Sequence, residues 1–207
     1  MPLSLAEGRA AVKLARETLE SHVRGAQVRP EPEPGPSGVL TEKRGVFVTL
    51  NTLERGAKEL RGCIGYPEPI KPLWEAIRDV TVYASEDPRF PLPVRAEELD
   101  LILVEVSVLT LPEEIHAASR REIPSKIRLG VDGLIISNPF TSGLFLPQVA
   151  TEQGWDQETF ISEACGKAGL PFDSWLKADT RVETFQAEVF AEQSPRGSVA
   201  RVDTSVT

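Results

Sequence analysis

Apolar residues return every three or four positions in two stretches of the chain, which predicts two amphipathic helices. The first covers about residues 6–23, and Ser4 stands where a capping residue would begin it. The second covers about residues 73–84 and follows Pro72, a residue suited to a helix start. Between them, the proline-rich segment 29–36 can hold neither a helix nor a central strand, so we expect a polyproline-like connector there.

Apolar runs and alternations predict the strands. Residues 45–50 form one strand, followed by a polar turn over residues 51–58. Residues 101–109 form the clearest one, with their even-numbered side chains on one face and Glu105 among leucines on the other. An ionised carboxylate in that position needs a partner or a water-lined cleft. An exposed strand face or a structural salt bridge is the alternative explanation.

The second half of the chain mixes short strands with helices. The predicted elements are a short strand near Ile115, a helical turn over 124–127, a strand pair at 133–137 and 143–146, helices over 147–152 and 157–168 with Asp156 as a cap, and a strand over 182–191. Because hairpins are interspersed with helices, rather than strands alternating regularly with helices, the pattern favours an α+β fold over a doubly wound sheet.

Composition narrows the class of protein. The 207 residues suggest one domain, or one domain with an appended lobe. A formal net charge of −8 disfavours nucleic-acid binding, which needs a basic face. We see no signal peptide and no run of about 20 apolar residues that could cross a membrane. The two cysteines lie about a hundred residues apart, so we expect reduced thiols in a cytoplasmic protein.

The hexapeptide Leu-Arg-Gly-Cys-Ile-Gly at residues 60–65 is the strongest candidate for chemistry, as either the returning strand or the loop that ends it. Gly62 and Gly65 would let the backbone approach a ligand and supply amides. Nearby Arg61 and these amides could stabilise a thiolate on Cys63, which makes Cys63 the candidate nucleophile. The alternative is a small buried residue, as we expect for Cys165 within its helix.

Other residues support this site less directly. A catalytic cysteine often needs a histidine, and the chain has only His22 and His116, neither of which the sequence places near Cys63. Arg61 and Arg89 suit an anionic ligand, or else each pairs with a carboxylate such as Asp87 or Glu105. We predict no metal site and no cofactor, because no zinc-ligand spacing, phosphate loop or dinucleotide motif is present.

The hexapeptide resembles the signature of the AMMECR domain family. The similarity continues through residues 87–91, 105–110, 130–133, 146–149 and 154–156, and so covers most of the chain. The resemblance implies one α+β domain over residues 4–195, with a mainly antiparallel sheet flanked by helices, a smaller second lobe and a cleft near the signature. Residues 196–207 would form a polar tail. The resemblance also groups Asp87, Arg89 and Phe90 with the signature, facing the same cleft.

Two hypotheses of function follow. The first is an enzyme, or an accessory to one, that binds a small anionic ligand or peptide near Cys63. The family resemblance implies a modification pathway shared with Memo-like and radical S-adenosylmethionine proteins. The second is a non-catalytic adaptor whose cleft docks a partner segment. Chemical turnover would favour the first hypothesis, whereas a stable complex without turnover would favour the second.

Overall fold

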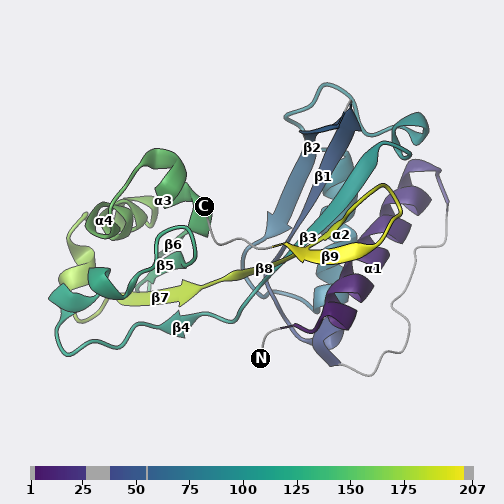
Figure 1. Ribbon diagram of the computed structural model, residues 1–207. Coiled ribbons are helices and arrows are strands. Elements are labelled where there is room, and N and C mark those ends of the chain that lie inside the picture. The colour runs from purple at the N-terminus through teal and green to yellow at the C-terminus, as the bar shows by residue number, and fades with distance from the viewer. Residues whose placement is uncertain (1–2, 27–37, 55, 203–207) are drawn as a thin grey trace. The chain divides into compact units, whose positions relative to one another are not determined.

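A computed structural model describes residues 3–26, 38–54 and 56–202 (Figure 1). These described residues divide into two compact units, the first made of those up to residue 109 together with 188–202 and the second of residues 110–187. Both units combine antiparallel strands with helices, so the predicted α+β class is confirmed. The predicted connector at residues 29–36 lies outside the described residues.

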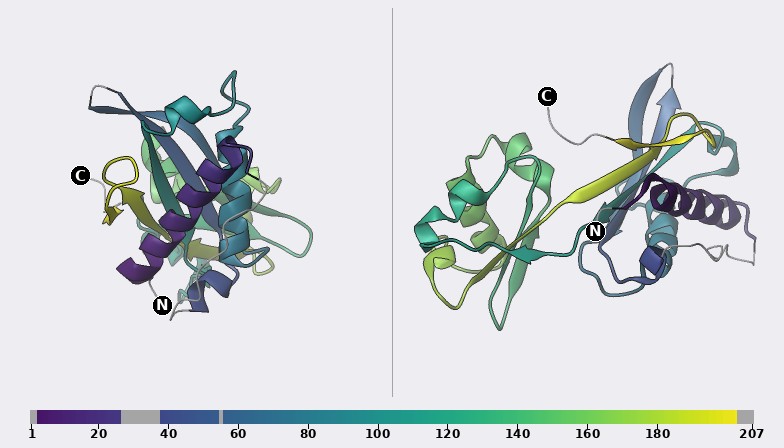
Figure 2. Two further views of the ribbon diagram at one scale, coloured as in Figure 1. Left: turned by 90° about the vertical axis from the view of Figure 1, so that its right-hand side faces the viewer. Right: turned by 60° about the horizontal axis from the view of Figure 1, so that its bottom comes forward.

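The first unit is a five-stranded sheet with two helices on one face (Figures 1 and 2). The strand order is β2-β1-β3-β8-β9, with bounds Val46–Glu54 for β1, Ala57–Tyr66 for β2, Ile102–Leu109 for β3, Ala187–Glu192 for β8 and Val199–Val202 for β9. Helices α1 (Leu5–Val23) and α2 (Leu73–Ser85) bury their apolar stripes against the even-numbered residues of β1 and β3. This packing confirms the predicted faces of the clearest strand.

The helix ends follow from their local sequence. Ser4 and Glu7 form a capping box at the start of α1, with each side chain accepting a hydrogen bond from the other residue's backbone N–H. Pro72 precedes α2, as the sequence predicts. Gly8 lets α1 approach the sheet closely, because a Cβ there would lie 2.1 Å from the ring of Phe190 in β8.

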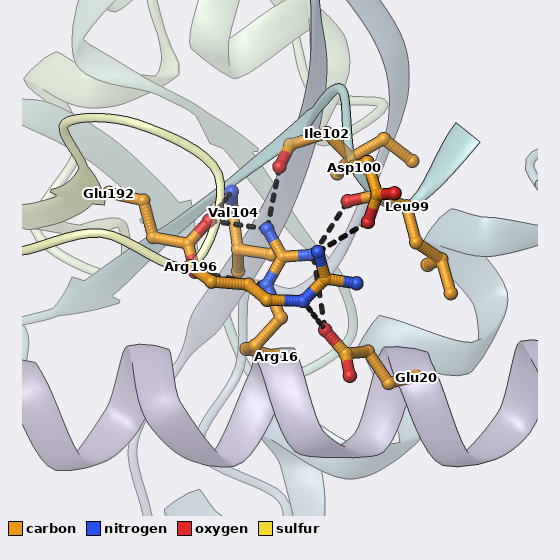
Figure 3. Close-up of polar contacts among 8 residues, drawn as sticks. All are labelled: Arg16, Glu20, Leu99, Asp100, Ile102, Val104, Glu192 and Arg196. Atoms are coloured by element: carbon orange, nitrogen blue, oxygen red, sulfur yellow. Dashed lines mark hydrogen bonds and ion pairs between the residues drawn. The ribbon is translucent and has the colours of Figure 1, made fainter. Parts of the chain in front are cut away.

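A buried ion pair fixes α1 to the sheet (Figure 3). Arg16 of α1 forms a salt bridge with Glu192 of β8, and both side chains are almost fully buried. The same guanidinium donates to the carbonyl oxygen of Ile102 at 2.6 Å, and Val104 N–H donates to Glu192 Oε2 at 3.0 Å. Each charged group is therefore satisfied inside the core, as burial requires.

Three predictions for this part of the chain need correction. Residues 51–58 are not a polar turn, because β1 and β2 continue as a paired hairpin to Glu54 and Ala57. The predicted strand over 182–191 is two strands of different sheets, with Gln186 between them. The predicted polar tail contains β9, which pairs with β8 over residues 199–202. In each case, backbone pairing between strands determines the structure of the segment and overrides the weak preference of its local sequence.

The second unit holds a four-stranded antiparallel sheet, β4-β7-β5-β6, and two helices (Figure 1). The strand bounds are Glu113–Glu114 for β4, Gly133–Ser137 for β5, Ser142–Phe145 for β6 and Arg181–Phe185 for β7, and the helices are α3 (Pro147–Gln153) and α4 (Gln157–Lys167). Asp156 caps α4 by accepting a hydrogen bond from Thr159 N–H. Cys165 lies in the core of this unit, as predicted.

Short 3₁₀ helices complete the fold. They cover Gly38–Thr41, Ala96–Glu98, Arg120–Glu122, Pro124–Lys126 and Ser174–Leu176. The helical turn expected at 124–127 is among them. In the part of the chain that the structure describes, we find no helix with the length and apolarity that spanning a bilayer demands.

Candidate functional site

The signature hexapeptide lies on β2, the edge strand of the five-stranded sheet. β2 pairs with β1, but the register shifts within the signature: Gly62 lies opposite Leu50 and Leu60 lies opposite Asn51. Arg61 is the extra residue of this β-bulge. A bulge redirects side chains and is common beside functional sites. The hexapeptide is thus the returning strand, with an irregularity that the sequence did not reveal.

Both signature glycines are needed for packing. A Cβ on Gly62 would lie 2.0 Å from the carbonyl oxygen of Ala84, at the end of α2. A Cβ on Gly65 would lie 2.2 Å from the ring of Phe47, its partner on β1. The first glycine lets β2 lie against the helix, and the second makes room for an aromatic ring beside Cys63.

The loop after α2 holds the backbone of Cys63 at the sheet edge. Asp87 Oδ2 accepts a hydrogen bond from Cys63 N–H at 2.9 Å. Arg89 Nη2 donates to the Cys63 carbonyl oxygen at 3.0 Å and to Asp87 Oδ2 at 2.6 Å. The hydrogen bond from Arg89, supported by Cys63 N–H, outweighs burial and holds the pKa of Asp87 well below its usual range. Asp87 is therefore an ionised anchor for β2.

A second ion pair holds Arg61. Its Nε lies 2.7 Å from Glu98 Oε2, and its Nη2 donates to the carbonyl oxygen of Leu92 at 3.0 Å. The guanidinium carbon sits 5.6 Å from the centre of the Phe90 ring, within the range of a cation–π contact. Burial opposes ionisation of Glu98, but the hydrogen bonds from Arg61 and Arg95 N–H lower its pKa overall.

The structure thus brings the signature and the loop at residues 87–90 together, as the sequence analysis expects. It also shows what the two arginines contact. Each guanidinium is paired with a carboxylate, Arg61 with Glu98 and Arg89 with Asp87. This matches the alternative in which the arginines hold the loops in place. Nη1 of each guanidinium makes no hydrogen bond to any described residue, so each arginine retains donors that a ligand could use.

Three polar side chains lie in a row across the sheet. Thr49 of β1 is the register partner of Cys63 on β2 and of Glu105 on β3. Residues directly opposite one another in antiparallel strands project from the same face. Their neighbours along the strands belong to the helix-covered core, so this row lies on the other face of the sheet. We refer to Cys63, Thr49 and Glu105 as the polar row.

Within the polar row, the Thr49 hydroxyl donates to Cys63 Sγ at 3.3 Å. Glu105 is half-buried, and neither a hydrogen bond nor a salt bridge joins its carboxylate to any residue in the described ranges. Burial raises the pKa of Glu105, and the charge of Lys58 only partly offsets this. The sequence predicts a partner or a water-lined cleft for this carboxylate, and the described residues supply neither a hydrogen bond nor an ion pair to it.

Other candidate groups lie elsewhere. His22 Nε2 is 2.8 Å from Glu86 Oε1, and His116 belongs to the second unit. Burial raises the pKa of the Cys165 thiol, in keeping with a core position. Across residues 3–26, 38–54 and 56–202, no three His, Cys, Asp or Glu side chains are grouped so that they could hold a metal ion.

Sequence reasoning missed two residues of this site. Thr49 is one polar residue among apolar ones in a predicted strand, and only the strand register makes it a neighbour of Cys63 and Glu105. Glu98 lies in a short 3₁₀ helix, and its pairing with Arg61 depends on tertiary structure. Of Thr49, Glu98 and Glu105, only Glu105 could be singled out from the sequence, because the alternation of side chains on β3 places it among leucines.

Comparison with known proteins gives the family. Residues 12–190 match the AMMECR1 family. A protein of Thermococcus gammatolerans is 53% identical over 196 residues, covering 94% of each chain, and one of Methanothermobacter thermautotrophicus is 53% identical over 192 residues, covering 92% of this chain and 97% of that protein. The crystal structure of the uncharacterised protein PH0010 from Pyrococcus horikoshii aligns with a TM-score of 0.72 at 48% identity, covering 94% of this chain and 96% of that one. The chain therefore belongs to the AMMECR1 family.

Proposed function

We propose that this protein is an enzyme, or an accessory to one, in which Cys63 acts on a small ligand bound over the polar row. The observation that carries the proposal is the cross-strand register, which brings a thiol, a hydroxyl and a half-buried carboxylate together on the sheet face opposite α1 and α2. Titratable groups with altered pKa values beside a nucleophile are typical of active sites.

Each residue of the polar row has a distinct role in this proposal. The Thr49 hydroxyl donates to Sγ and so orients the sulfur of Cys63 over the sheet. Glu105, whose pKa is raised by burial, accepts or returns a proton more readily near neutral pH than an ordinary glutamate. Asp87 and Arg89 bind the Cys63 backbone on both sides of its Cα and keep the thiol in place.

The anionic ligand expected from the sequence is part of the proposal in a narrower form. Because Arg61 and Arg89 are already paired with carboxylates, they offer an anion hydrogen bonds from Nη1 rather than an unbalanced charge. The inter-lobe cleft and the Memo-like and radical S-adenosylmethionine partners that the resemblance implies stay predictions.

Thiol labelling tests the role of Cys63. We expect iodoacetamide to modify Cys63 before Cys165 in the native protein, since Cys165 is buried in a core. Thr49→Val removes the donor to Sγ and should slow labelling of Cys63 at pH 7 about fivefold, the equivalent of one hydrogen bond. Peptide mapping by mass spectrometry gives both rates.

Thr52→Val is the matched control, because Thr52 lies on the same strand but is paired with Glu59 and Ile102 rather than with Cys63. It should leave the labelling rate unchanged. Faster modification of Cys165 than of Cys63, or equal rates for Thr49→Val and wild type, would refute the proposed role of the polar row.

A non-catalytic adaptor is the second candidate, and the ion pairs of Arg61 and Arg89 favour it, because paired arginines serve to hold a surface in shape. Arg61→Ala and Arg89→Ala distinguish the two candidates. If a ligand found by thermal-shift screening binds both folded variants as tightly as wild type, the arginines are structural and the adaptor gains support.

A further inference from the structure

The chemistry of the ligand can be inferred from the bonding around Glu105, given the proposed function of Cys63. We propose that the ligand over the polar row presents a hydrogen-bond-donating nitrogen, an ammonium or an amide, to the carboxylate of Glu105. Its reactive centre then lies beside Cys63. This inference names the chemical class of the ligand at the site already proposed. The group that faces Glu105 is then a hydrogen-bond donor rather than an anion.

The first argument is that the polar row has fewer hydrogen-bond donors than its acceptors can use. An ionised carboxylate is only an acceptor and can take several hydrogen bonds. The single hydroxyl proton of Thr49 is directed to Cys63 Sγ, so this neighbour on β1 does not serve Glu105. Throughout the described parts of the chain no other side chain or backbone N–H donates to Glu105, although Asp87 and Glu98 each accept several hydrogen bonds.

The second argument is charge. Among the described residues, Lys58 is the cation whose charge lowers the pKa of Glu105, and no salt bridge joins the two side chains. Nearer to Cys63, Arg61 and Arg89 are cancelled by Glu98 and Asp87. Glu105 is therefore the uncompensated charge of the site, and an anionic group placed against it would be repelled. A neutral or cationic donor would be attracted.

The third argument is geometry. Thr49 lies directly between Cys63 and Glu105, and adjacent strands are about 4.8 Å apart, so the two outer residues are separated by about 10 Å at the backbone. A ligand lying over Thr49 can reach both. Phe47, whose ring occupies the space above Gly65, forms an apolar border on the signature side. A short ligand with an electrophilic carbon and a nitrogen a few bonds away suits this row.

Three methanethiosulfonate reagents test the proposal on the full chain. Each forms a mixed disulfide with Cys63 and releases methanesulfinate, but the ethyl group carries an ammonium that can donate, a trimethylammonium that cannot, or a sulfonate. Each labelling rate is divided by the rate at which the same reagent reacts with glutathione, which corrects for the reagent's intrinsic reactivity. On this scale, we expect the ammonium reagent to label Cys63 about fivefold faster than the trimethylammonium reagent. The sulfonate reagent should be the slowest.

Two variants separate the hydrogen bond from general charge effects. Glu105→Gln should remove most of the preference for ammonium while circular dichroism shows an unchanged fold. Glu59→Gln, on the exposed end of β2, removes one negative charge just as Glu105→Gln does. It should leave the preference for the ammonium reagent unchanged.

The outcomes separate this inference from the proposed function. If Cys63 reacts with all three reagents but shows no donor preference, or if the preference survives in Glu105→Gln, the inferred ligand class is wrong and the role of Cys63 stands. If the sulfonate reagent is fastest, an anionic ligand replaces the donor. If no reagent labels Cys63, the proposed function and this inference both fail.

Discussion

Two glutamates on the same sheet have opposite surroundings. Glu192 of β8 lies on the helix side and accepts hydrogen bonds from Arg16 Nε at 2.9 Å and Val104 N–H at 3.0 Å, besides its salt bridge with Arg16 Nη2 (Figure 3). Glu105 of β3 lies on the face opposite α1 and α2, and the described residues give it no donor. One carboxylate is fully satisfied by the protein, whereas the other is left to solvent or to a ligand.

The two carboxylates show how a buried group that stabilises the fold differs from a half-buried group that is available to a ligand. Fully buried polar groups are nearly always hydrogen-bonded, whereas the oxygens of the half-buried Glu105 reach solvent and can accept from a bound ligand. The carboxylate of Glu192 is explained by the contacts that join α1, β3 and β8. For Glu105 the explanation we offer is the ligand over the polar row. The following predictions test whether the two carboxylates differ as this comparison requires.

The largest effect should come from Glu192→Gln. This change removes the closer and more deeply buried carboxylate partner of the Arg16 guanidinium, which is about 9% exposed, and leaves only Glu20 at 3.8 Å. Removing one member of a buried ion pair typically costs about 3–5 kcal/mol. Glu105→Gln, by contrast, breaks no protein hydrogen bond and should change the free energy of unfolding by less than about 0.5 kcal/mol. Urea denaturation followed by circular dichroism measures both.

The double variant Arg16→Met with Glu192→Gln serves as a control, because it removes the stranded charge together with its partner. It should recover part of the stability lost in the single variant. If Glu105→Gln were as destabilising as Glu192→Gln, Glu105 would have protein partners after all, and the comparison between the two glutamates would fail.

Asp87→Asn should have the next largest effect. The carboxylate binds Cys63 N–H and Arg89, and hydrogen bonds to a charged group contribute about 1.5–3 kcal/mol. Because folding lowers the pKa of Asp87, its contribution is full above the unfolded value of about 3.9 and is lost as pH falls towards the folded value. The advantage of wild type over Asp87→Asn should therefore shrink below about pH 4.

Urea unfolding of wild type and Asp87→Asn between pH 3 and pH 7 measures this difference. Arg128 and Asp132 of the second unit offer a comparison, since they form a similar pair with one buried carboxylate and one exposed guanidinium. An advantage of wild type over Asp87→Asn that did not change with pH would show that the Asp87 contacts are not electrostatic.

Local patterns predicted much of the fold. The bounds of α1 and α2 agree with the sequence because caps, proline and a helical apolar stripe all indicate the same ends. The break at Gln186 and the strand β9 were missed, since both depend on which distant strand offers backbone partners. Such information is absent from a local window of sequence.

The candidate site was predictable in part. Cys63, Arg61, Asp87, Arg89 and Phe90 do lie together, although the sequence left open whether the arginines bind a ligand or carboxylates. Glu98 and Thr49 could not be chosen in advance, because a polar turn and a threonine in a strand are ordinary features. Register and tertiary contact, rather than residue type, make them part of the site.

Arg196 provides a smaller test near the Arg16–Glu192 ion pair (Figure 3). Its guanidinium contacts Glu20 at 2.6 Å and Asp100 at 2.5 Å while its backbone is left-handed, with φ of 58° (Figure 3). Exposed pairs contribute at most about 1 kcal/mol, and left-handed backbone costs a non-glycine residue about that amount. Arg196→Gly should therefore unfold near the wild-type urea midpoint, and Arg196→Ala should be less stable by about 1 kcal/mol. Equal urea midpoints for Arg196→Gly and Arg196→Ala would show that the left-handed backbone at residue 196 is not strained.

The smallest effect, and the one most specific to the comparison, is the pH dependence that Glu105 contributes. Burial raises the pKa of Glu105 in the folded state, so between the unfolded value of about 4.3 and the folded value the native protein binds more protons than the unfolded chain. The stability of wild type relative to Glu105→Gln should therefore fall as pH rises through this window, opposite in sign to the effect of Asp87. Paired urea titrations from pH 4 to pH 8, with Glu59→Gln as the control for net charge, measure the slope. If wild type instead gained stability over Glu105→Gln with rising pH, the ionised carboxylate would be stabilised by the protein, and it would have no need of a donor from a ligand.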